Sequence, residues 1–590
     1  MKGFSFVYMA LSLKRWRVAP KAPAAYLSQF PRSDWLLVQV LYNRGIKDPA
    51  GVTAFLDGGQ DEANPFALEG MHDAVTRIRQ ALRREEQVVV YGDFDVDGLT
   101  ATALIVQTVR ALGGHAQPYI PHRVDEGYGL NEEALSALAG DGVSLVVTVD
   151  CGVRAIDEVG HANQLGLDVV VTDHHSLGRR LPEAVAVIDP KRAGSSDCAA
   201  GGCCNQLAGS GVAYRLAQAL LRSHEQAPVT RQDVSLQEED LLDLVALGTV
   251  ADLVPLRGEN RTLVRRGLER LNGMARPGVK ALCERARLGR GAVDATAIAY
   301  ILGPRLNAAG RIADAEVAYQ LLLTDREQKA EQLAAKLDGL NRERQHLTRE
   351  AYEIARQLAS ESEGEPLLLF AASPEFLPGV VGLAAGRLAD EFHRPAVVVE
   401  VGEETSRGSC RSIPGFHITR ALDACEDLLV RHGGHAAAAG FTVASSDLDT
   451  LADRLKNIAS AKLGDADLTP VLDVDVEIAL TEMSWDLLET LSMLEPCGRD
   501  NERPLFVSRD VPVRYYRAVG REGRHLKMAL SDGRATWDAI AFRQGEWAGQ
   551  LPDVIDVAYH LELNEWNGQR RLQLNVQDIR PAGTRSGSSD

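Results

Sequence analysis

Short apolar runs alternate with helix-like segments between residue 71 and about residue 255. The runs are QVVVY, SLVVTV, DVVVT and AVAVI. Unbroken apolar runs of this length are typical of strands that are buried on both faces. Strands separated by helices predict a parallel sheet that is covered by helices on both sides.

The pattern changes three times after this region. Residues 313–360 are rich in Ala, Leu, Glu, Lys, Gln and Arg and contain no proline, which predicts one or two long helices that bridge two domains. A second α/β unit follows, with the strands EPLLLFAAS and PAVVVEV and the helix GVVGLAAGRLADEF. From about residue 466 apolar and polar residues alternate, with turn signals at SDG and WNG. This last pattern predicts an all-β domain, a five-stranded barrel of the OB type.

The predicted fold class is therefore α/β. A parallel-sheet domain is joined by a long helix to a second α/β domain, and a C-terminal all-β, OB-like barrel follows. We expect six segments: an N-terminal helical segment (1–70), the parallel-sheet domain (71–312), the connecting helix (313–364), the second α/β domain (365–465), the barrel (466–582) and a disordered tail (583–590).

Composition narrows the classes of function. The net charge of −18 argues against a generally basic nucleic-acid-binding protein, but not against a local basic channel. The 8 cysteines are too sparse for a disulfide framework, which favours a reducing, cytoplasmic setting. The apolar run near the N-terminus is too short to span a bilayer. In an export signal the positive charges precede the apolar run, whereas here most of them follow it. We expect the natural start nearer Met9 than Met1.

Three cysteines, Cys198, Cys203 and Cys204, cluster in CAAGGCCN. They lack a C-x-x-C pair and a matching second half, so a flexible loop is favoured over a zinc site. The stretch 194–209 is expected to lengthen a loop, with an unknown effect.

Acidic side chains and histidines gather where the predicted strands end. Three aspartates follow QVVVY in YGDFDVDG, one follows SLVVTV, and an Asp-His-His triplet follows DVVVT. A further aspartate follows an apolar segment in GTVADLVPL. Sites in parallel α/β proteins lie at this end of the strands. The side chains are Asp93, Asp95, Asp97, Asp150, Asp173, His174, His175 and Asp252.

Carboxylates at this edge predict a metal site. The first strand–helix turn lacks G-x-G-x-x-G, and its acidic loop would repel a bare phosphate unless divalent cations lay between them. Carboxylates combined with imidazole suit manganese, zinc or iron better than calcium. Two ions bridged by carboxylates would support hydrolysis of a phosphoester or phosphoanhydride. A single aspartate after a strand is usually a helix N-cap, but acids at three strand ends favour the metal site.

The motifs YGDFDVDG, TVDCG, TDHH and GTVADLVPL resemble those of the DHH phosphoesterase family. GGHAAAAG with GSCRSI resembles its DHHA1 partner domain. Together with GPRLNAAGRI, the long helix and the β domain, the likeness over about residues 70 to 580 is most specific to the family's single-strand DNA exonucleases. The resemblance implies 5′→3′ hydrolysis of single-stranded DNA that releases 5′ mononucleotides in recombination and repair.

The resemblance also implies two bound Mn²⁺ ions, with Mg²⁺ as a possible substitute. Asp95 would ligate the first ion and Asp97 the second, and Asp150 would bridge both. His174 and Asp252 would complete the second site.

Three further residues would act beside the ions. Asp93 and Asp173 would orient ligands or turns. His175 would face the scissile phosphate as a proton or charge partner, with a structural role as the alternative.

Nine residues are expected to hold the substrate. The arginines and amides suit phosphate, and the glycines let the backbone approach an anion. The alternatives are a structural loop at a helix start and tight helix packing by the Gly/Ala run. The residues are Arg305, Asn307, Arg311, Ser409, Arg411, Ser412, Gly433, Gly434 and His435.

The β domain adds aromatic and basic side chains that could stack bases and follow a DNA backbone, although most aromatics in strands are core. They are Tyr515, Tyr516, Trp537, Phe542, Trp547, Trp566, Arg524, Lys527, Arg570 and Arg571. The expected partners are single-stranded DNA and, from the resemblance, a single-strand-binding protein and a RecQ-type helicase, with no membrane.

Two other functions stay open. A DHH enzyme for small substrates, such as a pyrophosphatase or a dinucleotide phosphodiesterase, would share the metal site but need neither the long helix nor the β domain. A non-catalytic binding protein on this fold would be expected to lack ligands, and here every candidate ligand is present. The sequence leaves open the preferred metal, processivity, activity on RNA and oligomeric state.

Overall fold

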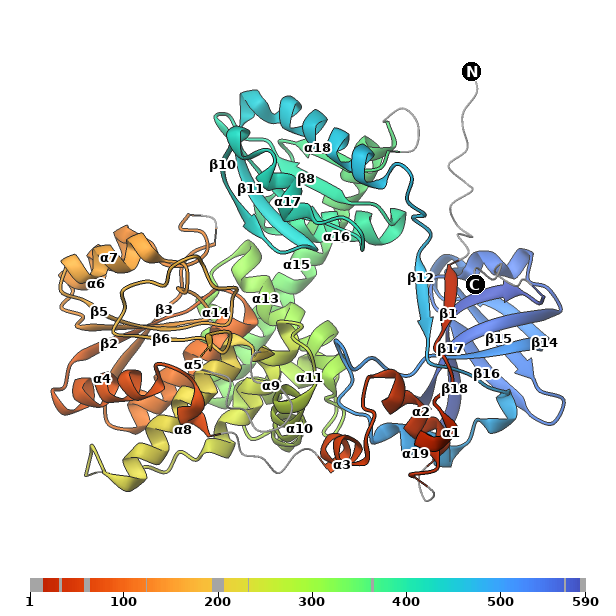
Figure 1. The fold of residues 1–590 in the computed structure, drawn as a ribbon, viewed down its shortest axis with the longest axis horizontal. Helices are drawn as coiled ribbons and strands as arrows, with labels where there is room; N and C mark the ends of the chain where they lie inside the picture. The colour runs from red at the N-terminus through yellow and green to blue at the C-terminus, as the bar shows by residue number, and fades with distance from the viewer. Residues whose placement is uncertain are drawn as a thin grey trace. The chain divides into compact units, whose positions relative to one another are not determined.

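In the computed structural model of the protein, the described residues are 14–30, 34–57, 64–123, 125–193, 206–231, 233–361, 366–566 and 569–583. The chain divides into two compact units, residues 61–466 and residues 1–60 together with 467–590 (Figure 1). The cysteine cluster of CAAGGCCN, the candidate starts Met1 and Met9, and the tail from residue 584 lie outside the described residues.

A five-stranded parallel sheet with the order β3-β2-β4-β5-β6 forms the centre of the first domain. Helices cover both faces of the sheet. Successive side chains of a strand point to opposite faces, so alternate residues pack into two separate cores. Val88 and Val90 join the core beneath α4, α5 and α8, and Val89 and Tyr91 join the core beneath α6 and α7. The predicted covered parallel sheet is confirmed. Its elements are β2 (Gln87–Tyr91), β3 (His115–Tyr119), β4 (Leu145–Val149), β5 (Asp168–Thr172), β6 (Ala186–Ile188), α4 (Met71–Arg83), α5 (Val96–Ala111), α6 (Glu132–Gly140), α7 (Ile156–Gln164) and α8 (Gly209–Gln226).

Strand β3 has no clear signal in the sequence. Its residues, HAQPY, are mostly polar and include Pro118. The strand lies at the edge of the sheet and buries only Ala116, so it needs little apolar surface and tolerates proline.

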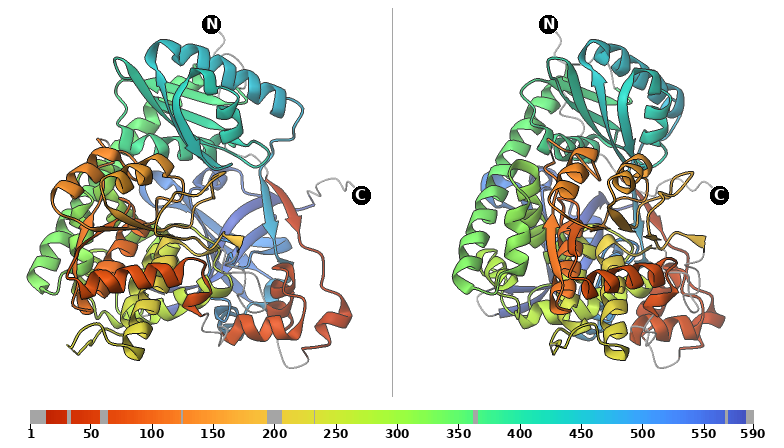
Figure 2. Two further views of the ribbon diagram at one scale, coloured as in Figure 1. Left: turned by 60° about the vertical axis from the view of Figure 1, so that its left-hand side comes forward. Right: turned by 90° about the vertical axis from the view of Figure 1, so that its left-hand side faces the viewer.

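A helical layer leads to the second domain. The 34-residue helix α15 (Glu327–Ser360) runs from one domain to the other, as Figures 1 and 2 show. Its early buried residues, such as Ala334, join the core of the first domain, and its late ones, such as Ala355, join the core of the second. The predicted long helices are confirmed. The preceding helices are α9 (Leu242–Ala251), α10 (Gly258–Gly273), α11 (Pro277–Arg285), α12 (Ala295–Ala297), the π-helical turn η6 (Ile298–Leu302), α13 (Gly303–Ile312) and α14 (Glu316–Leu323).

The second domain has a mixed sheet with the order β10-β11-β9-β8-β7, in which only β7 and β8 are parallel. The run GGHAAAAG forms the hairpin between β10 and β11 rather than a tightly packed helix. The elements are β7 (Leu369–Ser373), β8 (Ala396–Glu400), β9 (Thr405–Arg411), β10 (Leu429–Gly434), β11 (Ala438–Ala444), α16 (Pro378–Phe392), α17 (Ile418–Asp423) and α18 (Leu448–Leu463).

The other unit is a five-stranded barrel. Strand β14 pairs with β15 on one side and with β17 on the other, which closes the sheet, and β16 and β18 are parallel. The predicted OB-like barrel is confirmed. Its strands are β14 (Phe506–Val519), β15 (His525–Ser531), β16 (Thr536–Ala541), β17 (Val554–Trp566) and β18 (Gln569–Pro581), with β13 (Val476–Glu477) paired to β14.

The N-terminal residues belong to this barrel unit. Strand β1 (Arg15–Val18) pairs in parallel with β12 (Val471–Val474), and Leu37 and Leu41 of α2 (Trp35–Asn43) join the barrel core. The N-terminal residues join the barrel through contacts between residues more than 400 positions apart along the chain, such as the Arg15–Asp467 ion pair. The remaining helices are α1 (Ala24–Leu27), α3 (Pro49–Asp57) and α19 (Trp485–Ser492). Across the described ranges, no helix has the length and apolar character needed to cross a membrane.

Candidate active site

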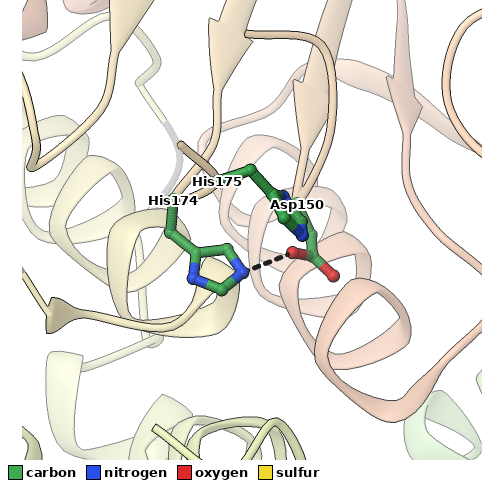
Figure 3. A group of neighbouring side chains, drawn as sticks. All are labelled: Asp150, His174 and His175. Carbon is green, nitrogen blue, oxygen red and sulfur yellow. Dashed lines mark ion pairs between the residues drawn. The ribbon is translucent and has the colours of Figure 1, made fainter. Parts of the chain in front are cut away.

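Acidic residues and histidines from several elements converge at the carboxyl end of the parallel sheet. Three sets of side chains have ligand atoms within 4.8 Å of one another. Figure 3 shows His174 pointing at Asp150. His174 Nε2 and Asp150 Oδ1 are 3.0 Å apart. The same nitrogen lies 3.9 Å from Asp97 and 3.7 Å from Asp252. The sets are Asp93 with Asp95 and Asp150, Asp97 with His174 and Asp252, and Asp150 with His174 and His175.

Two of the aspartates are held by helix N-termini. Asp97 accepts backbone N–H groups from Gly209 at 2.6 Å and Ser210 at 2.9 Å, in the first turn of α8. Asp95 caps α5 and accepts from the Gly98 N–H at 3.1 Å. Asp95 is therefore the N-cap of α5, and it also belongs to one of the three candidate ligand sets. Donors at a helix start stabilise a carboxylate and fix its direction.

Asp173 organises the turn that carries the two histidines. It accepts from the backbone N–H of Val153 at 2.9 Å, from that of His174 at 2.7 Å, and from Nδ1 of His175 at 2.7 Å. Burial acts to raise the pKa of Asp173, but the bond from His175 and the other donors outweigh it and lower the pKa to about 2. Burial acts to lower the pKa of His175, and the bond to Asp173 raises it overall. The pair therefore favours a protonated His175.

The cluster contains buried ligand atoms that are not satisfied by the protein. Asp93 Oδ1, Asp150 Oδ1 and His174 Nε2 have no hydrogen-bond partner of good geometry among the described residues. Burial, followed by the charge of Asp95, raises the pKa of Asp93 to about 8. Burial lowers the pKa of His174 to about 4, which keeps the imidazole neutral. Unpaired carboxylate oxygens beside a neutral imidazole fit divalent cations.

Three glycines allow the backbone to close around these carboxylates. A Cβ atom added at Gly209 would lie 2.8 Å from Asp150 Oδ1, and one at Gly248 would lie 2.6 Å from Asp97 Oδ1. A Cβ atom at Gly98 would lie 2.6 Å from the Cβ of Asp93. The close approach of α5, α8 and α9 therefore requires glycine at these positions.

The acidic cluster predicts an unusual pH dependence for the metal-free protein. The pKa of Asp93 is about 8 in the fold and near its ordinary 3.8 in the unfolded chain, so the folded state binds this proton more tightly. The resulting stability is complete below about pH 4 and is lost as the pH rises towards 8. We expect the melting temperature in EDTA to fall between about pH 5 and pH 8, and Mn²⁺ to restore it. Thermal scans would contradict this if the metal-free protein were as stable at pH 8 as at pH 5.

Arginines gather beside the acids and define what we call the arginine cluster, Arg123, Arg311 and Arg411. Arg311 donates to the Gly379 carbonyl at 3.4 Å, and Arg411 donates to Ser409 Oγ at 3.4 Å. Burial, followed by the charges of Arg123, Arg344 and Arg411, lowers the pKa of Arg311 to about 9. None of the three forms an ion pair within the described part of the chain. Guanidinium groups without an ion-pair partner are suited to binding a phosphate.

Several predicted substrate residues make contacts within the protein. Arg305 pairs with Asp338 of α15 at 3.2 Å, and the Asn307 side chain accepts the Val96 N–H at 3.1 Å. Ser412 donates to the Phe416 carbonyl at 2.6 Å. These contacts position α13, the aspartate loop and the end of β9.

The hairpin of the second domain reaches the same site. The rings of His435 and His175 lie 6.4 Å apart at an interplanar angle of 12°. Gly433 has open space where a side chain would stand, and Gly434, at φ +142°, packs against the Ala438 carbonyl.

Sequence reasoning missed two residues of the loop that follows β3. Arg123 lies 4.5 Å from the Phe94 ring centroid and is close enough to Asp93 and Asp95 to feel their charge. The Tyr128 hydroxyl donates to the Asp150 carbonyl at 3.1 Å and lies 3.1 Å from His175 Nδ1. Basic and aromatic residues in a glycine-containing loop were the available signal, but without β3 the loop could not be assigned to the site.

The aromatic residues of the barrel divide into two groups. Trp547 is buried in the core and Trp537 packs against it, whereas Tyr515 is 56% and Phe542 51% exposed, and Tyr516 is also exposed. The Trp566 side chain lies outside what the structure describes. Among the basic residues, Arg524 pairs with Glu522, Arg570 approaches the Trp485 ring and Arg571 bonds to Gln569. Lys527 lies opposite Arg517 in the β14–β15 ladder.

Comparison with known proteins agrees with this architecture. Residues 87–249 match the N-terminal domain of the DHH family, 366–461 the DHHA1 domain and 474–578 the RecJ OB domain. The single-stranded-DNA-specific exonuclease RecJ of Bacillus subtilis (strain 168) is 36% identical, over 92% of this chain and 67% of that protein. RecJ of Dickeya dadantii (strain 3937) is also 36% identical, over 94% of this chain and 97% of its own length.

Solved structures show the same fold. RecJ from Thermus thermophilus in complex with Mn²⁺ superimposes with a TM-score of 0.82 at 30% identity, over 98% of this chain and 81% of that one. A complex of the same protein with Mg²⁺ has a TM-score of 0.76.

A covered parallel sheet whose strand ends carry acids and an Asp-His-His turn, followed by a DHHA1 domain, defines a metal-dependent phosphoesterase of the DHH class. Within that class, the chain belongs to the RecJ family of single-stranded-DNA-specific exonucleases.

Proposed function

We propose that this protein hydrolyses single-stranded DNA from its 5′ end and releases 5′ mononucleotides, with two divalent ions, Mn²⁺ or Mg²⁺, at the acidic cluster. The observation that carries the proposal is the set of buried, unsatisfied ligand atoms on Asp93, Asp150 and His174 next to the arginine cluster. The first group fits metal ions, and the second fits a phosphate.

The grouping of side chains supports specific ligand roles. Asp150 would contact both ions, because it belongs to one set with Asp95 and to another with His174. Asp97 and Asp252 would complete the set around His174. Asp93 would be a ligand of the first ion rather than only an orienting group, because its free oxygen is buried in that set.

The chemistry follows from the residues around the ions. Bound divalent ions would lower the pKa of a water and neutralise charge on the phosphate oxygens. Release of a 5′ mononucleotide breaks the bond between phosphorus and the 3′ oxygen of the leaving nucleotide, and water supplies OH to phosphorus and H to that oxygen. His175, kept protonated by Asp173, would stabilise charge on the phosphate or provide a proton.

The arginine cluster would give the enzyme its polarity. A terminal 5′ phosphate carries more negative charge than an internal one, so it would bind best where Arg123, Arg311 and Arg411 have no protein carboxylate as ion-pair partner. Ser409 would add a hydroxyl beside Arg411. With that phosphate held, the next phosphodiester would lie over the acidic cluster.

The first test uses one single-stranded oligonucleotide, labelled at the 5′ end in one tube and at the 3′ end in another, with Mn²⁺. We expect immediate release of a labelled mononucleotide from the 5′ label and stepwise shortening seen from the 3′ label. The opposite order would reject the proposed polarity. Inert DNA together with rapid cleavage of a dinucleotide or pyrophosphate would support a small-substrate enzyme instead.

The same proposal includes a place in DNA recombination and repair in the cytoplasm. A single-strand-binding protein would present the strand, and a RecQ-type helicase would unwind duplex ahead of the enzyme. Stimulation of degradation on a duplex by adding each protein separately would test these partners.

A further inference from the structure

The connecting helix α15 changes character at its centre. Its buried face is apolar where it meets the first domain, at Ala334, and again where it meets the second, at Ala355. Between Leu337 and Ala351 the buried side chains are polar, namely Asp338, Asn341 and Thr348. A polar stretch on the buried face of a helix needs partners, and Asp338 has one in Arg305.

Arg344 lies within this polar stretch and has no charged partner. One of its terminal nitrogens donates to Asn341 at 2.8 Å, and its backbone carbonyl accepts from Thr348. Its Nε is buried and has no hydrogen-bond partner among the residues described. Burial, followed by the charges of Arg387 and Arg305, lowers the pKa of Arg344. The charge of Arg344 in turn lowers the pKa of Arg311. A partly buried cation with an unsatisfied donor and cationic neighbours is suited to an anion.

Helix α16 supplies the adjoining surface. Gly382 faces Ser409 and Arg411, since a Cβ atom there would lie 2.8 Å from Ser409 Oγ and 3.3 Å from an Arg411 nitrogen. Gly386, one turn later, also faces Arg411, at 3.9 Å. Arg387 follows directly, and it is exposed to solvent. Glycine at these positions therefore lets α16 approach Ser409 and Arg411 closely. Arg344 lies near enough to Arg387 and to Arg311 for their charges to act on one another, so a second pair of cations adjoins the arginine cluster.

We propose that Arg344 and Arg387 form a second phosphate subsite next to the arginine cluster, so that the enzyme binds DNA whose 5′ end carries a triphosphate better than DNA with a 5′ monophosphate. This inference rests on the proposed function, in which the arginine cluster holds the first phosphate of the strand. A terminal monophosphate is satisfied by that cluster alone. The additional phosphates would reach Arg344 and then, towards solvent, Arg387.

The chemistry of the cleavage step stays the same. Water adds OH to phosphorus, the bond from phosphorus to the 3′ oxygen breaks, and the 3′ oxygen takes the proton. The product is a nucleoside 5′-triphosphate in place of a 5′-monophosphate. Product identity is therefore a direct readout of whether the triphosphate end enters intact.

The test compares two oligonucleotides of one sequence that differ only in a 5′ monophosphate or 5′ triphosphate, both with a 3′ fluorophore. The measured quantity is the ratio of kcat/KM for the triphosphate end to that for the monophosphate end. We expect a ratio of about ten or more for the unaltered protein, and a ratio near one for Arg344→Met. Arg356→Met is the matched control, because Arg356 lies on the same helix and pairs with Glu391 at 3.0 Å. The control should keep the full ratio.

Each remaining outcome has a definite meaning. A ratio of one or less in the unaltered protein overturns the subsite, and so does an Arg344→Met variant that loses both substrates equally. Arg344→Lys keeps a positive charge and should retain part of the preference. It therefore tests the subsite even if the methionine variant does not fold. If the unaltered protein degrades neither oligonucleotide, the proposed function itself fails.

Discussion

Asp150→Asn is expected to lower kcat by at least about a thousandfold, because Asp150 belongs to two of the three ligand sets. The amide keeps the shape but removes the charge and one lone-pair site that two cations would share. Initial rates on a 5′-labelled oligonucleotide with Mn²⁺ measure the effect. Titration calorimetry should show weaker binding of Mn²⁺.

The same substitution should raise the thermal stability of the metal-free protein. Burial and the charges of Asp97, Asp95 and Asp252 raise the pKa of Asp150 well above its ordinary range, so the ionised carboxylate opposes folding. Melting in EDTA at pH 8 separates this prediction from simple damage to the fold, which would lower the melting temperature.

Asp141→Asn is the matched control, because Asp141 is an exposed residue at the end of α6. It should leave activity and stability unchanged. A fully active Asp150→Asn variant would contradict the assignment of the metal centre.

Asp97→Ala tests the same metal centre, but it also removes a structural contact. We expect it to abolish hydrolysis and to leave DNA binding largely intact, but Asp97 also accepts the two N–H groups at the start of α8. Loss of both binding and fold in that variant would mean that Asp97 is mainly structural.

The sequence predicted the fold well where a strand is buried on both faces. QVVVY and SLVVTV are continuous apolar runs because helices cover both sides of the sheet, and their strands occur where expected. Strand β3 was missed because an edge strand buries only one residue, and β1 because its pairing with β12 depends on residues far apart in the chain.

The acidic part of the site was predictable for a related reason. Parallel strands end at one edge, so Asp97, Asp150 and His174 had to approach each other once the strands were known. The sequence did not indicate that Arg305 would be engaged by Asp338, since that contact depends on how α15 crosses α13. Tyr128 was missed because its loop follows the unrecognised edge strand.

Gly209→Ala is expected to reduce activity about a hundredfold although it replaces none of the proposed ligands. An added Cβ atom would lie 2.6 Å from the Cβ of Asp150 and 2.8 Å from its Oδ1, so the aspartate or the start of α8 must move. A displacement of this kind costs about a hundredfold in rate when it misplaces reacting groups, and overpacking costs about 1–3 kcal/mol of stability. Rates with Mn²⁺ and urea unfolding measure the two effects.

Gly160→Ala provides the control for the chemistry of the substitution. Gly160 lies within α7 of the same domain and has nothing within 4 Å of an added Cβ atom. That variant should keep full activity and gain about 0.5–1 kcal/mol, because alanine favours a helix over glycine. Equal behaviour of the two variants would mean that α8 can shift without disturbing Asp150, and that the close packing at Gly209 does not position the metal ligands.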